Sequence, residues 1–499
     1  MRPDDVGAGT VVNTTTVTSA EPDAQTLIDL YRSALAPIGE LVELRLDGLD
    51  RLGVPVTSCS LVVDGRTAHA GNGYGRTVEA AVLSGLGELA EGAFAARHVA
   101  RLRPSAVRAS RRRLVAREGA DRVVDPRTLC LPVGSPWTEE LELSWVPLER
   151  VPDGESVWVP LEYVASEVGE LDGGTPLITP ITNGLGAGLD DSRPLLHGLL
   201  ELLQRHTNAT RFRALDHLSP EIDQATLPQE LTTLVDAFRD LGVEPVLKHA
   251  GTELGVVSTY VMGVDASPSQ AILVTGCGEA AAPDAVESLT KALLEYANSR
   301  ARKAFCFGDP ERARAIAPEG YWSALGSGAG EARAHEALTA WAGLGTAGLT
   351  ALTAPDRSRT VAFSDVTVEP VPGPGVEEQL QHVLGHLAAD DLTHDVLTAR
   401  SRHGDVVVAK TVVTGLEAET LSYGRVGELG ARRLLATDLD LVRRQPSGTE
   451  RHSERVVLTP EAEERLGGPV WWSPTDADRV LGPLYPLYRE PPRHSVAVV

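Results

Sequence analysis

Three segments of the sequence combine a glycine-rich stretch with a helical pattern that ends in acidic or amide side chains. They cover residues 72–91, 181–205 and 276–298, and the endings SGLGELAE and HGLLELLQ match at four positions. Because residues three apart share one face of a helix, the polar residues at each ending point the same way: Glu88 with Glu91, Glu201 with Gln204, and Glu295 with Asn298. Three such copies predict one composite site rather than three separate ones.

Carboxylates that converge from separate helices need a cation between them, because like charges at short range raise each other's pKa. Oxygen ligands without nearby His or Cys suit Mg²⁺, which proteins usually share with substrate phosphates. Glycines such as Gly184, Gly186 and Gly188, next to Asn183, predict a loop with positive φ whose N–H groups hold phosphates. The sequence therefore predicts a nucleoside triphosphate with Mg²⁺, without a GxxxxGKS/T loop. The alternative is that each polar pair is a solvated helix face.

The elements that must position these residues alternate between helix and strand. An amphipathic pattern predicts a helix from Ala24, and β-branched residues predict a strand over 54–64. Two strands around the turn PDGE predict a hairpin over 143–164, and a helix over 227–242 precedes further strands. Asp190 and Ser192 are N-cap candidates for the second helix, with Pro194 in its first turn. The alternation predicts an α/β (α+β) fold with internally repeated glycine-loop and helix units.

Composition divides the chain of 499 residues into three parts. Residues 1–24 are polar and threonine-rich, which predicts a flexible N-terminal arm. We expect one main domain over 25–440, with a variable segment near 324–375 that is rich in Gly, Ala and Pro. Residues 441–499 form a C-terminal extension that ends in a proline-rich tail.

Charge and cysteine usage exclude several classes of protein. A formal net charge of −23 argues against nucleic-acid binding. The sequence has no apolar run near 18 residues, so we expect no membrane association. Its four cysteines form no C-x-x-C pair, which is typical of reduced thiols in a cytoplasmic protein. One segment, 97–117, carries eight arginines; it is either a solvated helix surface or a dock for an acidic leader peptide.

Several of these motifs resemble the YcaO family in the family's order. The resemblance is carried by GNGYG with SGLGELAE, TNGLGAG with HGLLELLQR, LDGLDRLGVPV at 46–56, LLEYANSRA at 293–301 and the downstream VVVAKTVVTGLEAETLSYGRVGELGARRL. It implies an enzyme that uses Mg-ATP to activate a backbone amide of a ribosomally made precursor peptide. A neighbouring nucleophile then closes an azoline or a macrocyclic amidine by cyclodehydration, or a thioamide forms with a partner protein.

Carried over by position, the resemblance implies magnesium ligands at Glu88, Glu91, Glu201 and Glu295. It implies nucleotide contacts at Ser84, Asn183 and Arg205. Two positions depart from the family pattern: Gln204 stands where a second Glu is usual, and Asn72 where a Lys is frequent. Arg76 or Arg205 could replace that Lys as a phosphate partner.

Other roles stay open. His197 and His206 flank the second site helix, and either could be a general base or a bystander, so no catalytic residue is assigned. Lys291 could meet a phosphate or form an i,i+4 ion pair, and Arg300 could steady a phosphate or lie on the surface. The chain could act alone, as a homodimer or with a separately encoded partner. The alternatives to the enzyme are a peptide-binding scaffold with a decayed ATP site and a carboxylate-metal hydrolase.

Overall fold

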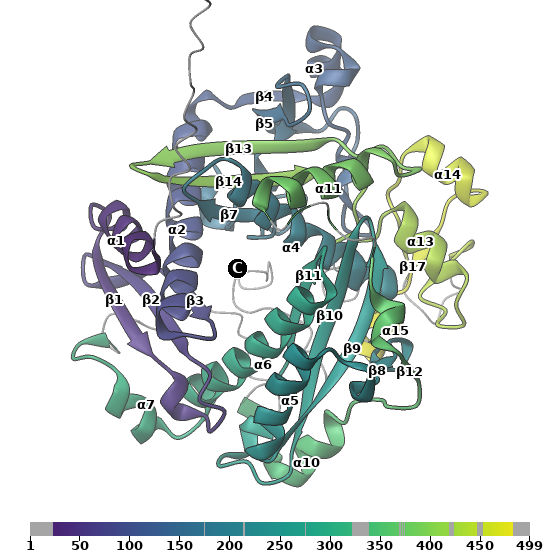
Figure 1. The fold of residues 1–499 in the computed structure, drawn as a ribbon. Helices are drawn as coiled ribbons and strands as arrows, with labels where there is room; N and C mark the ends of the chain where they lie inside the picture. Colours follow the sequence, from purple (N-terminus) through teal and green to yellow (C-terminus); the bar gives the residue numbers. More distant parts are fainter. Residues whose placement is uncertain are drawn as a thin grey trace, which may run out of the picture.

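The computed structural model describes residues 23–482, except 174, 213–214, 275, 322–338, 369–370, 372, 374, 419–423 and 447–452. The expected arm before residue 23 and the proline-rich tail after residue 482 lie outside this part. Three mixed layers, each a sheet with its helices, surround a common centre (Figure 1). Helices and strands alternate along the chain, as the sequence predicts, and the strands pair antiparallel except β8 with β12.

The first layer is an antiparallel sheet in the order β1 (Glu40–Arg45), β2 (Val56–Val63) and β3 (Arg66–Tyr74). Helix α1 (Ala24–Leu35) packs on the long helix α2 (Val78–Leu102), which covers the sheet. Thr77 caps α2 by accepting a hydrogen bond from the Ala80 N–H. This layer positions the first of the three repeated segments.

The second layer is a sheet in the order β4 (Val107–Ser110), β5 (Glu142–Arg150), β13 (Val396–His403), β14 (Val406–Val413) and β7 (Leu185–Gly188). Strand β6 (Ser156–Pro160) pairs with β5, which confirms the predicted hairpin. Helix α4 (Ser192–Arg211) follows β7 and packs against it and β14, and α11 (Val376–Ala388) packs on α4. The N-cap of α4 is Asp191, rather than the predicted Asp190 or Ser192. The Asp190 carboxylate nevertheless accepts hydrogen bonds from the N–H groups of Ser192 and Arg193 in the first turn.

The third layer is a sheet in the order β11 (Gly278–Ala282), β10 (Val256–Asp265), β9 (Val243–Glu253), β8 (Glu221–Ile222) and β12 (Thr360–Val361). Helices α5 (Gln229–Asp240) and α6 (Ala285–Phe307) pack on it through a shared apolar core. Three shorter helices, α3 (Arg111–Glu118), α7 (Pro310–Ile316) and α10 (Gly345–Leu352), lie outside the sheets.

The C-terminal part adds a small sheet in the order β15 (Val442–Arg443), β17 (Trp471–Trp472) and β16 (Glu454–Arg455). Helices α13 (Glu428–Leu435), α14 (Pro460–Leu466) and α15 (Pro474–Leu481) accompany it. Its apolar cluster includes the buried Trp472 and extends to Phe212 at the end of α4. Residues beyond 440 therefore pack on the same body as the second site helix.

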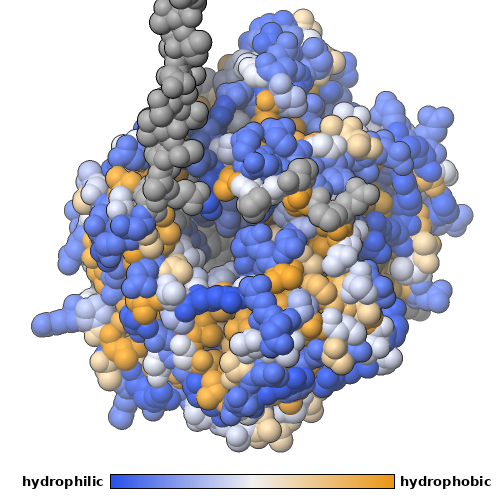
Figure 2. All heavy atoms as spheres, in the orientation of Figure 1, coloured by the Kyte–Doolittle hydropathy of each residue, from blue (hydrophilic) through white to orange (hydrophobic). Residues whose placement is uncertain are grey.

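The visible surface is mostly polar. Figure 2 shows one face on which hydrophilic residues dominate and hydrophobic ones form small, separate patches. In the part of the chain that the structure describes, no helix is both long and apolar enough to cross a membrane.

Most glycines named in the three segments do not form the predicted loops with positive φ. Gly184 has a positive φ of 85°, but Gly73, Gly186 and Gly278 lie within strands. A Cβ at Gly73 would lie 2.0 Å from the Gly85 nitrogen, and one at Gly278 would lie 2.0 Å from the Ala292 carbonyl oxygen. At Gly186 it would lie 2.1 Å from the Pro194 carbonyl oxygen. These glycines let each strand lie directly against its own helix, rather than forming phosphate-binding loops.

Arg300 also has a different role from those expected. Its buried guanidinium donates hydrogen bonds to the Asp50 carboxylate at 2.8 Å and to the Asp265 carboxylate at 2.9 Å. Asp265 pairs with Arg51 as well. Arg300 therefore ties α6 to the β1–β2 connection and to the end of β10, and it does not lie on the surface.

We expect Gly278→Ala to lower the free energy of unfolding by about 3 kcal/mol, because the added methyl group forces β11 away from α6. Gly385→Ala on α11 is the matched control, since nothing lies within 4 Å of the place that an added Cβ would take there. That control should gain up to about 1 kcal/mol from helix propensity. Chemical denaturation of both variants measures the difference; equal stabilities would contradict this packing role.

A second prediction concerns Glu162, which is buried beside β6. Its Oε2 accepts hydrogen bonds from the Leu177 and Ile178 N–H groups at 2.5 and 3.4 Å, in the segment that leads to Asn183. Burial raises the pKa of Glu162 to about 7, above its ordinary value of 4.5. The folded state thus holds a proton at pH 5–6 that the unfolded state has lost, so this contribution to stability disappears as the pH rises through 7.

Between pH 5 and pH 8 we therefore expect the wild type to lose about 3 kcal/mol more stability than Glu162→Gln, which cannot ionise. Denaturant titrations of both proteins at the two pH values measure this difference. Parallel pH profiles would show that Glu162 does not titrate in this range.

Candidate functional site

One hydrogen bond recurs in all three repeated segments. The Glu88 carboxylate on α2 accepts from the Asn72 N–H at 2.8 Å, and Glu201 on α4 accepts from the Gly184 N–H at 2.9 Å. Glu295 on α6 accepts from the Glu279 N–H at 3.0 Å. In each case the oxygen is Oε2, and the partners lie 16 or 17 positions apart in the chain. Each site helix is therefore fixed at the same point to the strand or turn that precedes it.

The three units also contact one another in a closed ring. Helix α2 packs against β7, α4 packs against β11, and α6 packs against β3. A polar contact accompanies each step. The Glu91 carboxylate accepts from the Ala187 N–H of β7 at 3.1 Å, and Arg205 of α4 donates to Glu279 of β11 at 2.6 Å. Arg76, after β3, donates to the Thr290 hydroxyl of α6 at 3.3 Å. We call these three strands and three helices the ring.

Several carboxylates of the ring raise the pKa of one tyrosine, Tyr74. Burial raises the pKa of Tyr74, at the end of β3, well above its usual value. The negative charges of Glu295, Glu88 and Glu279 raise this pKa further. Carboxylates from α2, β11 and α6 are therefore close enough to influence one phenol, as a composite site requires.

The residues predicted to contact a nucleotide lie on or beside the ring. Ser84 is exposed on α2, one turn before Glu88. Asn183 is buried, and its carbonyl oxygen accepts a hydrogen bond from the Lys410 ammonium at 2.8 Å. Arg205 lies between two carboxylates, 2.6 Å from Glu279 and 3.7 Å from Glu201. The structure therefore brings the predicted nucleotide and metal residues into one region.

Two residues of the site were missed from the sequence, one in the ring and one beside it in β14. Glu279 follows Gly278 directly, at the position that Asn72 occupies in the first unit, and this equivalence was the available signal. Lys410 is buried in β14 and donates to the carbonyl oxygens of Ile181 and Asn183. It fixes the backbone just before the Gly184 turn.

The other candidates divide between structural and open roles. The Nδ1 of buried His206 accepts a hydrogen bond from the Glu417 N–H at 2.9 Å, and its Nε2 lies 3.4 Å from the Glu253 carboxylate. Both imidazole nitrogens of His206 therefore have partners. His197 is more exposed, with its Nε2 3.8 Å from the Glu91 carboxylate. Lys291 forms the i,i+4 ion pair with Glu287, at 2.7 Å. Arg76 turns towards Glu230 at 3.2 Å, so Arg205 is the better placed of the two proposed substitutes for a Lys.

The donor set of the ring fits Mg²⁺ only together with a phosphate ligand. Within the described residues, no three His, Cys, Asp or Glu side chains gather closely enough to hold a metal by themselves. The ring instead offers carboxylates from several elements, each oriented by a backbone N–H. Mg²⁺ is commonly bound by one or two carboxylates plus substrate phosphates. The arrangement matches that mode of binding.

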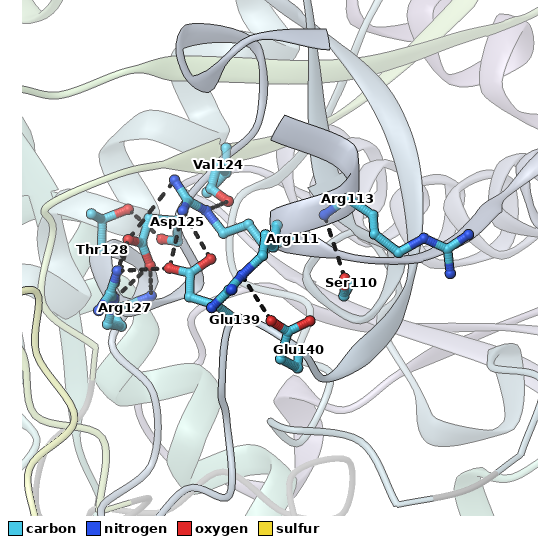
Figure 3. Close-up of polar contacts among 10 residues, drawn as sticks. Ser110, Arg111, Arg113, Val124, Asp125, Arg127, Thr128, Glu139 and Glu140 are labelled. Atoms are coloured by element: carbon cyan, nitrogen blue, oxygen red, sulfur yellow. Dashed lines mark hydrogen bonds and ion pairs between the residues drawn. The ribbon is translucent and has the colours of Figure 1, made fainter. Parts of the chain in front are cut away.

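The arginine-rich segment is paired mainly with the chain's own acids. Arg111 contacts Glu139 at 3.1 Å, while Arg127 bridges Asp125 and Glu139 at 2.6 and 3.0 Å (Figure 3). Further pairs join Arg103 to Asp172, Arg112 to Glu140, Arg113 to Glu142 and Arg117 to Glu118. These contacts neutralise much of the charge that a leader-peptide dock would use, which favours the solvated-surface interpretation.

A cavity of about 480 Å³ lies apart from the ring, at the far end of α4. Its lining includes Arg211, His249, Thr252 and Arg433. Both arginines pair with the Glu253 carboxylate, at 2.6 and 2.8 Å. Burial raises the pKa of Glu253, but the hydrogen bonds from His206 and Arg433 outweigh it and lower the pKa to about 2. One carboxylate, that of Glu253, thus contacts both arginines in this wall.

Comparisons with known proteins show which family the chain resembles. The model of the YcaO family, described as a cyclodehydratase that binds ATP and Mg²⁺, matches residues 72–417. An uncharacterized protein of Methanothermobacter thermautotrophicus is 29% identical over 276 residues, which are 54% of this chain and 68% of that protein.

Two solved structures share the fold. YcaO from Methanopyrus kandleri, bound with AMPPCP and Mg²⁺, is 20% identical with a TM-score of 0.55, over 81% of this chain and 93% of that one. A heterocyclase in complex with substrate and cofactor is 15% identical with a TM-score of 0.59; the match covers 82% of this chain and 54% of that one. The predicted fold class and family are confirmed. Because the family match starts at Asn72, ends at Glu417 and spans well over half of the sequence, this chain belongs to the YcaO family of ATP- and Mg²⁺-dependent cyclodehydratases.

Proposed function

We propose that this chain activates a backbone amide of a ribosomally made precursor peptide with Mg-ATP and closes an azoline or a macrocyclic amidine. The observation that carries the proposal is the ring, in which three helix glutamates are fixed by equivalent backbone N–H groups and Arg205 lies beside one of them, Glu201. A nucleotide-dependent family member needs such a set of oriented carboxylates, because Mg²⁺ binds oxygen ligands shared with phosphates.

In this proposal, the glutamates of the ring hold Mg²⁺: Glu88, Glu91, Glu201 and Glu295. Ser84, Asn183 and Arg205 contact the nucleotide. The guanidinium of Arg205 suits phosphate oxygens because its N–H groups form a rigid fork. When bound, Mg²⁺ offsets the charge of the phosphates, which is much of what phosphoryl transfer requires of a protein.

The proposed reaction balances as follows. A side-chain or terminal nucleophile of the peptide loses its proton and adds to an amide carbon. The amide oxygen attacks the γ-phosphorus of ATP, and ADP leaves. Phosphate then leaves with that oxygen, and loss of the amide N–H proton gives the C=N bond. The sum is peptide plus ATP to cyclised peptide plus ADP and phosphate.

A second candidate function follows from the departures within the ring. Gln204 and Asn72 are uncharged where the family frequently has charged residues, which favours a peptide-binding scaffold with a decayed ATP site. The two functions differ in one respect that can be measured. The enzyme must bind Mg-nucleotide, whereas the scaffold binds peptide without it.

The first test is calorimetric titration of wild type with a non-hydrolysable ATP analogue in the presence of Mg²⁺. We expect micromolar affinity, and a loss of at least tenfold in Glu201→Ala, which removes a carboxylate and its bond to Gly184. Glu463→Ala is the matched control; this glutamate lies on α14 and pairs with Arg455 at 2.6 Å. A folded wild type that binds no nucleotide would leave the scaffold as the better function.

A further prediction concerns the metal alone. Because the carboxylates come from separate elements and form no closed cage within the described residues, Mg²⁺ should bind measurably only with nucleotide present. Calorimetric titration of Mg²⁺ with and without the analogue measures this dependence. Equal micromolar affinity in both titrations would contradict the shared-ligand arrangement.

A further inference from the structure

The cavity at the C-terminal end of α4 is formed where three elements meet. Both β9 and α13 pack against α4 (Figure 1). Arg211 at the end of α4 and Arg433 of α13 lie in the wall, and Phe212, Leu218 and Pro220 add apolar surface. Leu218 is 37% exposed, so the cavity opens to solvent. Its volume of about 480 Å³ lies in the range of ligand-binding pockets.

One carboxylate holds both arginines of this wall. Oε1 of Glu253 accepts from Nε of Arg211 at 2.6 Å and from Nη1 of Arg433 at 2.8 Å. Oε2 accepts from the Thr210 hydroxyl at 3.1 Å and lies 3.4 Å from Nε2 of His206. Each oxygen of Glu253 therefore has two partners, and the two guanidinium groups are fixed side by side.

The two guanidinium groups have hydrogen-bond donors left over. A guanidinium carries N–H donors on each of its nitrogens. Within the described residues, Arg211 donates only through Nε, and Arg433 only through Nη1, which also contacts the Thr210 carbonyl oxygen at 3.1 Å. Two positive charges that share one carboxylate repel each other, and the remaining N–H groups suit a second anion.

Two further titratable residues line the cavity. Burial, and then the positive charge of Arg211, lower the pKa of His249 to about 4, so His249 is neutral at pH 7. Asp365 lies exposed on η10 (Phe363–Val366), where it accepts from the Ser364 hydroxyl at 3.3 Å. In the described part of the chain, Asp365 forms no ion pair with either arginine. The arginine side of the cavity is therefore its anion-binding side.

Helix α4 connects this cavity with the ring. Glu201 and Arg211 are ten positions apart on it, which corresponds to about 15 Å along the helix axis. An extended peptide advances about 3.3 Å per residue, so about five residues span that length. Arg433 lies beyond residue 417, where the family match ends. Part of the wall therefore comes from outside the matched segment.

We propose that this cavity binds a carboxylate of the peptide substrate between Arg211 and Arg433, at least about five residues from the amide held at the ring. Guanidinium groups bind carboxylates through parallel N–H···O bonds, and Phe212 and Leu218 contact the neighbouring side chains of the peptide. The identity of the ligand rests on the proposed function, in which a precursor peptide is the substrate. The two arginines select the peptide and take no part in its chemistry.

The test is calorimetric titration of the wild type with acetyl-Leu-Glu-Leu amide and with acetyl-Leu-Gln-Leu amide, which differ in one charge. We expect the Glu peptide to bind about tenfold more tightly, because hydrogen bonds between charged groups are the stronger ones. A third probe, acetyl-Leu-Gln-Leu with a free C-terminus, distinguishes the two sources of a carboxylate. Binding as tight as that of the Glu peptide identifies a chain terminus as a ligand; weaker binding identifies an acidic side chain.

Variants of opposite expected effect separate binding from a structural role. Arg433→Gln should weaken binding of the Glu peptide about tenfold and leave the Gln peptide unchanged. Asp365→Asn should tighten it about twofold, because a like charge is removed from the rim. Arg432→Gln is the matched control on α13; Arg432 pairs with Glu428 at 2.6 Å, and its replacement should change neither affinity.

Equal affinities for the two capped peptides, or no binding of either, overturn the inference. So does Arg433→Gln that behaves like Arg432→Gln, or Asp365→Asn that does not tighten binding. If Arg433→Gln does not fold, Arg211→Gln decides in the same way, since Arg211 is 47% exposed. Titration with Mg²⁺ and the ATP analogue tests the proposed function separately: a protein that binds the Glu peptide but no nucleotide overturns the ATP-dependent reaction and leaves the carboxylate site.

Discussion

The hydrogen bond from a strand or turn N–H to a helix glutamate is the interaction on which the ring depends. It occurs at Glu88, Glu201 and Glu295 with almost the same length each time. A carboxylate that accepts a backbone N–H has a defined position. The same bond fixes the helix against its strand, so the local structure and the placement of charge have one cause.

The close approach that this bond requires explains the glycines. Gly73, Gly186 and Gly278 leave no space for a Cβ between strand and helix. Buried ion pairs and hydrogen bonds hold the surrounding elements in place. Arg300 joins α6 to Asp50 and Asp265, and Lys410 joins β14 to the Gly184 turn. Breaking one partner of such a pair would leave a buried charge without compensation.

Sequence patterns predicted the repeats, the alternation of elements, the hairpin over 143–164 and the family. These features depend on local periodicity and on motif order. The role of the glycines could not be predicted, because a glycine needed for close packing looks the same as one needed for positive φ. Burial of Arg300 depends on Asp50, which is 250 positions away in the sequence. Glu279 was missed because its partners Arg205 and Asn208 lie on another unit.

The backbone origin of the repeated bond has a consequence for how such a ring can diverge. Because the main-chain N–H makes the contact, the side chain at each donor position is not needed for it. This chain has Asn72, Gly184 and Glu279 at the three donor positions, and the bond is the same. Asn72 and Glu279 are thus positions at which mutation can change the local electrostatics while the scaffold stays intact. Gly184 is not, because its φ is 85° and a Cβ there would lie 2.3 Å from the Thr411 carbonyl oxygen. The ring therefore has two donor positions at which a side chain can adjust affinity for an anionic ligand.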